Sequence, residues 1–263
     1  MTVFSVASLL SLDSLKILDP KKPQTKDYTL AGLEIQNSPV GLFLQNSGYD
    51  VSNLSIFNFL NKQPQFTHSH MVNFGQAFNM RTLTASIYKD INKRFFRTGA
   101  SKDDRLTDLN YNKNTIDFLL KKISFTSGRP KFIYAHLLMP HSPYFFNEDG
   151  RLNPPAERNS ESSYLGYLKY CNKQIEIVIK KIFECSKKPP IILLLSDHGY
   201  RGGPAAASKE YFFMNLSAIY LPDKNYGSLY DGISLPNQIR TVLNSQFGQT
   251  LPLIRDTTIL LKE

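Results

Sequence analysis

Hydrophobic residues recur at helical spacing in some stretches of the chain and form short apolar runs in others. The helical spacing predicts helices over residues 3–12, 79–96, 115–125, 160–184 and 236–247. The apolar runs predict strands over residues 51–57, 131–139, 191–195 and 218–221. Because strands alternate with helices, the pattern predicts an α/β fold, a three-layer sandwich with a central, mostly parallel sheet and helices on both faces.

Capping residues and proline-containing segments mark where elements begin and end. Ser38 and Pro39 are typical of a helix start, and Gly48 is expected to end that helix. Gly248 is expected to end the helix over residues 236–247. Loops are expected at residues 20–24, 99–108, 140–155 and 199–208. The chain shows neither an internal repeat nor a linker, so residues 1–263 are expected to form a single domain.

The composition is that of a folded soluble protein, with 263 residues, of which 41% are hydrophobic and 20% are charged. The run at residues 191–195 is much shorter than the roughly 20 apolar residues of a membrane-spanning helix. The first ten residues are apolar and lack a basic region and a cleavage site, which argues against a secretory signal peptide. They are typical of a domain interior, so we expect an upstream segment to be missing.

The net charge of +9 is concentrated in the first half of the chain. Residues 1–131 hold 17 Lys and Arg against 10 Asp and Glu, whereas residues 132–263 hold 14 against 12. A basic face of this kind can meet nucleic acid, anionic lipid or a phosphate-bearing substrate, or it can be an ordinary solvated surface. No nucleic-acid-binding motif is present, so no specific nucleic-acid partner is expected.

Two cysteines, Cys171 and Cys185, fall in one predicted helix, 14 residues apart. That spacing separates them by about 21 Å along the helix, too far for a disulfide. Both are expected to be free thiols in or near the core.

The segment from Ser196 to Gly199 follows a predicted buried strand directly and carries Asp197 and His198. Ligands bind at the carboxyl ends of strands in open α/β sheets. An adjacent carboxylate and imidazole suit a divalent metal ion with open coordination positions. The alternative is a polar strand exit whose aspartate caps the next segment.

A second cluster lies at residues 136–144, where another predicted strand runs into a loop. His141 stands between two prolines, which restrict the backbone, and could donate to an oxyanion or protonate a leaving group. The alternative is a hydrogen bond to a loop carbonyl. His136 is expected inside the strand, either buried or supporting the site. His68 and His70 form a weaker candidate metal pair without an evident third ligand.

These two clusters, together with the Ala-Ser-Leu-Leu sequence at residues 7–10, resemble the sulfatase/alkaline phosphatase superfamily. The resemblance is strongest to its bacterial cell-envelope branch, the lipoteichoic acid synthase-like and phosphoethanolamine transferase-like proteins. Residues 215–222 and 234–240 also resemble the closing strand and helix of such domains. The resemblance implies the following site: Thr2 as nucleophile, His141 as a catalytic residue, Asp197 and His198 as ligands of one divalent ion (Zn, Mn, Mg or Ca), and His136 and Tyr144 in substrate binding.

The activity implied is transfer or hydrolysis of a phosphate ester, in preference to a sulfate ester, through a phosphothreonine. Lipid head groups or envelope glycans are the implied substrates. The implied location is the extracytoplasmic, periplasmic face of a bacterial membrane, with membrane contact through the basic face.

The start of the chain departs from the family pattern in two ways. Val3, Phe4 and Val6 break the Cys-x-Pro-Ser-Arg motif of sulfatases, although Ser5 is kept. The acidic metal ligand expected on a strand before the nucleophile is also absent, so we expect an N-terminally truncated chain that lacks its first strand. One alternative is a catalytically impaired fragment that acts as a non-catalytic binding module. Another is that Thr2 is an N-terminal threonine nucleophile.

Overall fold

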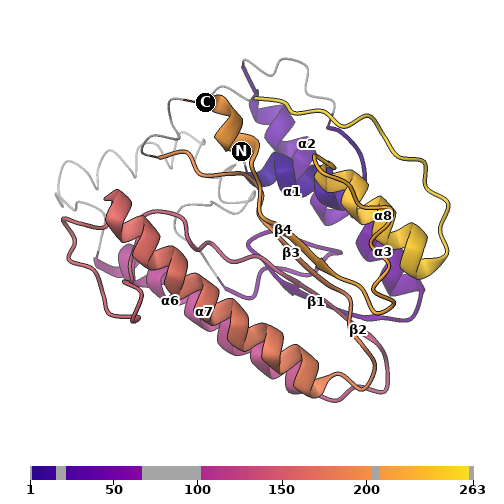
Figure 1. The fold of residues 1–263 in the computed structure, drawn as a ribbon, viewed down its shortest axis with the longest axis horizontal. Coiled ribbons are helices and arrows are strands. Elements are labelled where there is room, and N and C mark those ends of the chain that lie inside the picture. Colours follow the sequence, from indigo (N-terminus) through magenta and orange to yellow (C-terminus); the bar gives the residue numbers. More distant parts are fainter. Residues whose placement is uncertain (1, 16–21, 67–101, 203–207, 261–263) are drawn as a thin grey trace, which may run out of the picture. The chain divides into compact units, whose positions relative to one another are not determined.

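The computed structural model describes residues 2–15, 22–66, 102–202 and 208–260, without the side chains of residues 102–108. The described α-helices are α1 (Thr2–Ser11), α2 (Thr25–Gln36), α3 (Pro39–Asn46), α6 (Lys102–Ser124), α7 (Glu161–Cys185) and α8 (Leu235–Phe247). A 3-10 helix, η2, spans Lys209–Phe213, and the strands are β1 (Asp50–Leu54), β2 (Lys131–Ala135), β3 (Ile192–Leu195) and β4 (Ser217–Tyr220). These elements form an α/β protein (Figure 1).

The chain divides into two compact units, each of which is described by itself. The first unit contains residues 1–50, 59–61 and 180–263, and the second contains residues 51–58 and 62–179. The single catalytic domain expected from the sequence stays a prediction.

Helix α1 lies at the centre of the helical packing in the first unit. It buries an apolar face and packs against α2, α3 and α8 (Figure 1). Two side chains fix its C-terminal end: Ser38 donates to the Leu10 carbonyl at 2.9 Å, and Arg240 donates to the Leu12 carbonyl at 2.8 Å. The predicted N-terminal helix is therefore confirmed.

Strands β3 and β4 pair with each other in antiparallel orientation, with Ile192 opposite Tyr220 and Leu195 opposite Ser217. The expected parallel arrangement is wrong for this pair. A parallel pair requires a crossover connection, usually an α-helix. The described part of the connection between β3 and β4 contains the short η2 helix instead.

In the second unit, β1 and β2 form a two-stranded sheet. Strand β1 ends earlier than predicted because Asn53 accepts from both the backbone and the hydroxyl of Ser55, forming a local turn that replaces the ladder. Strand β2 is also shorter than predicted. His136, expected inside the strand, lies directly after its end, where its N–H still donates to Leu54.

Local capping signals located several helix ends correctly. Ser38 accepts from the Gly41 N–H at the start of α3, and Gly248 ends α8 in the left-handed conformation, with a φ of 63°. The expected loop over 99–108 is wrong from Lys102 onward, because α6 begins there. The predicted helix over residues 79–96 lies outside the described residues.

Helix α2 was not predicted from the sequence. Its N-terminus is closed by a reciprocal capping box between Gln24 and Asp27. Glutamine is not a preferred N-cap residue type, so this start lacked a strong signal.

Both cysteines lie in α7 as expected, and neither forms a disulfide. Cys171 is buried, and burial raises the pKa of its thiol to about 12. None of the helices in the described ranges is both long and apolar enough to cross a membrane.

Candidate functional site

The segment after β3 is fixed by hydrogen bonds to the residues that precede β4. Ser196 donates its N–H to the Leu216 carbonyl at 3.0 Å, and its hydroxyl accepts from the Leu216 N–H at 2.7 Å. The Asn215 amide donates to the Ser196 carbonyl at 3.2 Å. Ser196 thus extends the β3–β4 pairing by one residue and presents Asp197 and His198 immediately beyond the sheet.

Gly199 closes this segment against the residues around η2. Its N–H donates to the Phe212 carbonyl at 2.8 Å. A Cβ atom at this position would overlap the Tyr211 carbonyl oxygen and lie 2.9 Å from that of Met214. Both obstacles are backbone atoms, so no side chain fits without moving the chain. The glycine of the Ser-Asp-His-Gly sequence is therefore required here for close backbone approach.

Asp197 and His198 present a carboxylate and an imidazole to the same space. Their Oδ1 and Nε2 atoms lie 3.8 Å apart, and the side chains are 23% and 28% exposed. The Nδ1 atom of His198 lies 2.8 Å from the Gly199 carbonyl oxygen. A carbonyl oxygen can only accept, so Nδ1 carries the proton and Nε2 keeps its lone pair. The alternative interpretation was that the aspartate caps the next segment. Among the described contacts, no backbone N–H donates a hydrogen bond to the Asp197 carboxylate.

This arrangement fits two ligands of one divalent ion. Metal bonds to carboxylate oxygen and imidazole nitrogen are about 2.0–2.2 Å long, so two ligands of one ion can lie up to about 4.4 Å apart. A backbone carbonyl that fixes the other ring nitrogen is also typical of metal-binding histidines. Among the described residues, however, no group of three or more His, Cys, Asp or Glu side chains could hold a metal. His68 and His70 lie outside the described residues.

Thr2 is the first residue of α1 and is partly exposed. It belongs to the same compact unit as Asp197 and His198. The closeness of its hydroxyl to the Asp197 carboxylate stays a prediction.

His141 lies in the loop after β2 and is exposed. Its N–H donates to the Leu138 carbonyl at 2.9 Å, and its Nδ1 lies 2.6 Å from the Ser142 carbonyl oxygen. The sequence-based alternative, a hydrogen bond to a loop carbonyl, is therefore present. It does not exclude a catalytic role, because the same contact fixes the proton on Nδ1 and leaves Nε2 for another partner.

His136 and Tyr144, at the two ends of this cluster, contact other aromatic rings. The His136 ring meets Phe57 edge-on, with centroids 5.7 Å apart. The Tyr144 ring packs at 5.4 Å from Tyr164 and 6.4 Å from Tyr167, both in α7. These contacts give both residues a packing role, and their role in substrate binding stays a prediction.

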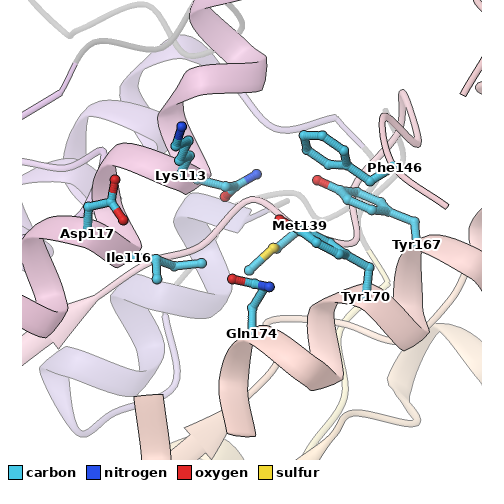
Figure 2. A pocket seen from close by; sticks show the side chains of 9 residues that line it. Lys113, Ile116, Asp117, Met139, Phe146, Tyr167, Tyr170 and Gln174 are labelled. Carbon is cyan, nitrogen blue, oxygen red and sulfur yellow. The ribbon is translucent and has the colours of Figure 1, made fainter. Parts of the chain in front are cut away.

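Close to this loop the structure contains a pocket that the sequence did not reveal. Its volume is about 40 Å³, enough for one or two water molecules. Figure 2 shows its lining side chains, which come from α6, from α7 and from the loop after β2: Asn112, Lys113, Ile116, Asp117, Met139, Phe146, Tyr167, Tyr170 and Gln174. Tyr167 and Tyr170 lie one helical turn apart, which is the sequence signal that could have indicated an aromatic face.

The predicted site residues thus fall into two groups. Asp197 and His198 are brought together, and Thr2 lies in their unit. The other group, His136, His141 and Tyr144, belongs to the second unit.

Comparison with known proteins gives one match. A model of the Sulfatase family matches residues 15–235, most of the chain. The matched range contains both strand exits and begins after Thr2. Neither the curated proteins nor the solved structures gave a match.

Proposed function

The chain belongs to the sulfatase family, and we propose that it transfers or hydrolyses a phosphate ester, in preference to a sulfate ester. Family membership indicates hydrolase or transferase activity on sulfate or phosphate esters. The observation that carries the proposal is the Asp197–His198 pair, held 3.8 Å apart beyond β3 with the His198 Nε2 lone pair free. The fold we propose is a single catalytic domain, a three-layer sandwich with a mostly parallel central sheet.

Asp197 and His198 are the residues that would hold a divalent ion, whose bound form polarises a phosphoryl oxygen and favours a deprotonated nucleophile. Thr2 supplies that nucleophile. Its Oγ1 gives its proton to solvent water and forms a bond to phosphorus as the bond from phosphorus to the leaving alcohol breaks. Water or an acceptor hydroxyl then takes the phosphoryl group from the threonine.

His141 acts on the leaving group. With Nδ1 held by the Ser142 carbonyl, the charged ring presents its Nε2–H outward. That proton passes to the leaving alcohol oxygen, so the alcohol departs neutral. His136 and Tyr144 contact the substrate in this proposal.

The resemblance of the two strand exits to lipoteichoic acid synthase-like and phosphoethanolamine transferase-like proteins supports an assignment to that branch. The proposed substrates are lipid head groups or glycans of the cell envelope, and the proposed location is the periplasmic face of a bacterial membrane. The excess of basic residues supports contact with anionic lipid.

The test is hydrolysis of bis(p-nitrophenyl) phosphate and p-nitrophenyl sulfate, each with Mn²⁺, Mg²⁺, Zn²⁺ or Ca²⁺. We expect metal-dependent cleavage of the phosphodiester in excess of the sulfate. Thr2→Ala should lower the rate about 10³-fold or more because it removes the nucleophile, whereas Thr2→Ser keeps a hydroxyl and most of the rate. Mass spectrometry should detect a p-nitrophenyl phosphoryl group on Thr2 after reaction with the diester. Turnover that survives Thr2→Ala would contradict the assigned nucleophile.

A second candidate is a catalytically impaired member of the family that binds its ligand without turnover. It is favoured by the lack of a third metal ligand beside Asp197 and His198 among the described residues. Absence of turnover with both esters and all four ions, together with retained binding of inorganic phosphate, would support this candidate.

A further inference from the structure

Two neighbouring residues of α6 hydrogen-bond to the loop that carries His141. The Tyr111 hydroxyl donates to the His136 carbonyl at 3.0 Å. The Asn112 side-chain oxygen accepts from the Leu138 N–H at 2.7 Å. Both contacts bridge more than twenty residues of sequence, and they hold the two ends of the three-residue segment that leaves β2.

Leu138 links Asn112 to His141. Leu138 gives its N–H to Asn112, and its carbonyl accepts the His141 N–H at 2.9 Å. The position of the His141 backbone is therefore fixed relative to α6 by two consecutive hydrogen bonds. Its ring is in turn held through Nδ1 by the Ser142 carbonyl.

The two anchoring side chains are themselves fixed in the core of the second unit. Tyr111 is 2% exposed and Asn112 is 9% exposed. A side chain enclosed in a close-packed core has little freedom to move, so the anchor is rigid. Asn112 lines the small pocket described above. Tyr167 of α7 and Met139 of the loop after β2 line it as well (Figure 2).

We propose that Tyr111 and Asn112 are positioning residues for His141, holding the loop after β2 so that the imidazole Nε2 meets the leaving-group oxygen. This inference rests on the proposed function, in which His141 is the proton donor. Proton transfer requires heavy atoms within about 2.6–3.2 Å, and a misplacement of about 1 Å can cost about a hundredfold in rate. The loop has no regular secondary structure after β2, so the precision must come from such external contacts.

The test compares Asn112→Leu and Tyr111→Phe with Leu119→Ala, a control that truncates another buried side chain of the same helix, one that has no polar group to hydrogen-bond the loop. Asn112→Leu keeps the approximate volume but leaves the Leu138 N–H without its acceptor. We expect it to lower kcat about 10- to 100-fold with KM nearly unchanged, and Tyr111→Phe to lower kcat by about tenfold or less. Leu119→Ala should reduce the unfolding temperature but leave kcat within about twofold when assayed below that temperature.

Amide hydrogen exchange gives a readout that does not depend on activity. In Asn112→Leu, the Leu138 and His141 amides should exchange at least about tenfold faster than in the wild type, whereas in Leu119→Ala they should not exceed the change seen at other loop amides. Unchanged exchange at both amides would overturn the anchoring. An unchanged kcat in Asn112→Leu, where His141→Ala lowers kcat, would overturn the positioning role. If His141→Ala itself left kcat unchanged, the proposed function would fall, and the exchange data would still decide the anchoring.

Discussion

The exits of β2 and β3 both present a histidine, but they are constructed differently. After β3, Asp197 and His198 are sequence neighbours, and hydrogen bonds from Ser196 and Gly199 to residues 212–216 fix the segment on both sides of the pair. After β2, His141 stands six residues beyond the end of the strand, and its loop is held by side chains of α6. Two adjacent side chains need only a tight turn to lie together, whereas a lone side chain on a loop needs contacts from other elements to fix its position.

The first test of this difference between the two strand exits is made at His141. His141→Ala should lower the rate of phosphodiester cleavage by about 10²–10⁴-fold, because it removes the proton donor to the leaving alcohol. The unfolding temperature should hardly change, since the ring is exposed. Steady-state kinetics and thermal unfolding measure the two quantities.

Asp149→Ala is the matched control, an exposed side chain in the same loop with no assigned role. It should retain the wild-type rate. A wild-type rate in His141→Ala would remove the β2 exit from the chemistry and leave the β3 exit as the whole of the site.

At the β3 exit, the test concerns the close backbone packing around Gly199. Gly199→Ala should destabilise the fold by about 1–3 kcal/mol, because the added methyl group overlaps backbone atoms that cannot yield without a shift of the chain. Urea unfolding measures the loss. Gly128→Ala is the control, because a Cβ atom there meets no other atom within 4 Å. Equal stability of the two variants would show that close packing is not what fixes the β3 exit.

Acid should change the free energy of unfolding by a smaller amount, through a different carboxylate in each unit. In the first unit, partial burial raises the pKa of Asp256, but hydrogen bonds from Ser234, Tyr230 and Asn237 outweigh it and bring the pKa to about 2. This lowered pKa contributes stability above the unfolded pKa of about 3.9, and the contribution is lost as the pH falls from about 4 to 2.

Asp256→Asn should remove that acid-dependent part, amounting to less than about 1 kcal/mol because the carboxylate is exposed and solvent screens it. Unfolding free energies measured between pH 2 and 6 check the effect. In the second unit, the hydrogen bond and charge of Lys169 lower the pKa of Glu148. Glu148→Gln is therefore the variant of that unit to compare with Asp256→Asn. Identical pH profiles for Asp256→Asn and the wild type would contradict the assigned network.

The sequence located the features whose cause is local. Ser38 and Gly248 revealed helix ends because capping depends on a few neighbouring residues. Asp197 and His198 were selected as candidate ligands because the two side chains are adjacent in sequence and follow an apolar run. The antiparallel pairing of β3 and β4 was not predictable, since strand direction depends on how the connection returns. The contact of Asn112 with Leu138 was hidden for a related reason, because 26 residues separate the two partners.

Metal binding by Asp197 and His198 is the most direct test of the candidate site. Calorimetric titration of the chain with Mn²⁺ and with Zn²⁺ should give one ion per chain. Asp197→Asn keeps the shape of the side chain but removes its charge, and should weaken binding at least about tenfold. One bound ion with affinity lost in Asp197→Asn is the predicted result. Absence of binding, or equal affinity in Asp197→Asn and the wild type, would contradict the assignment of this strand exit as a metal site.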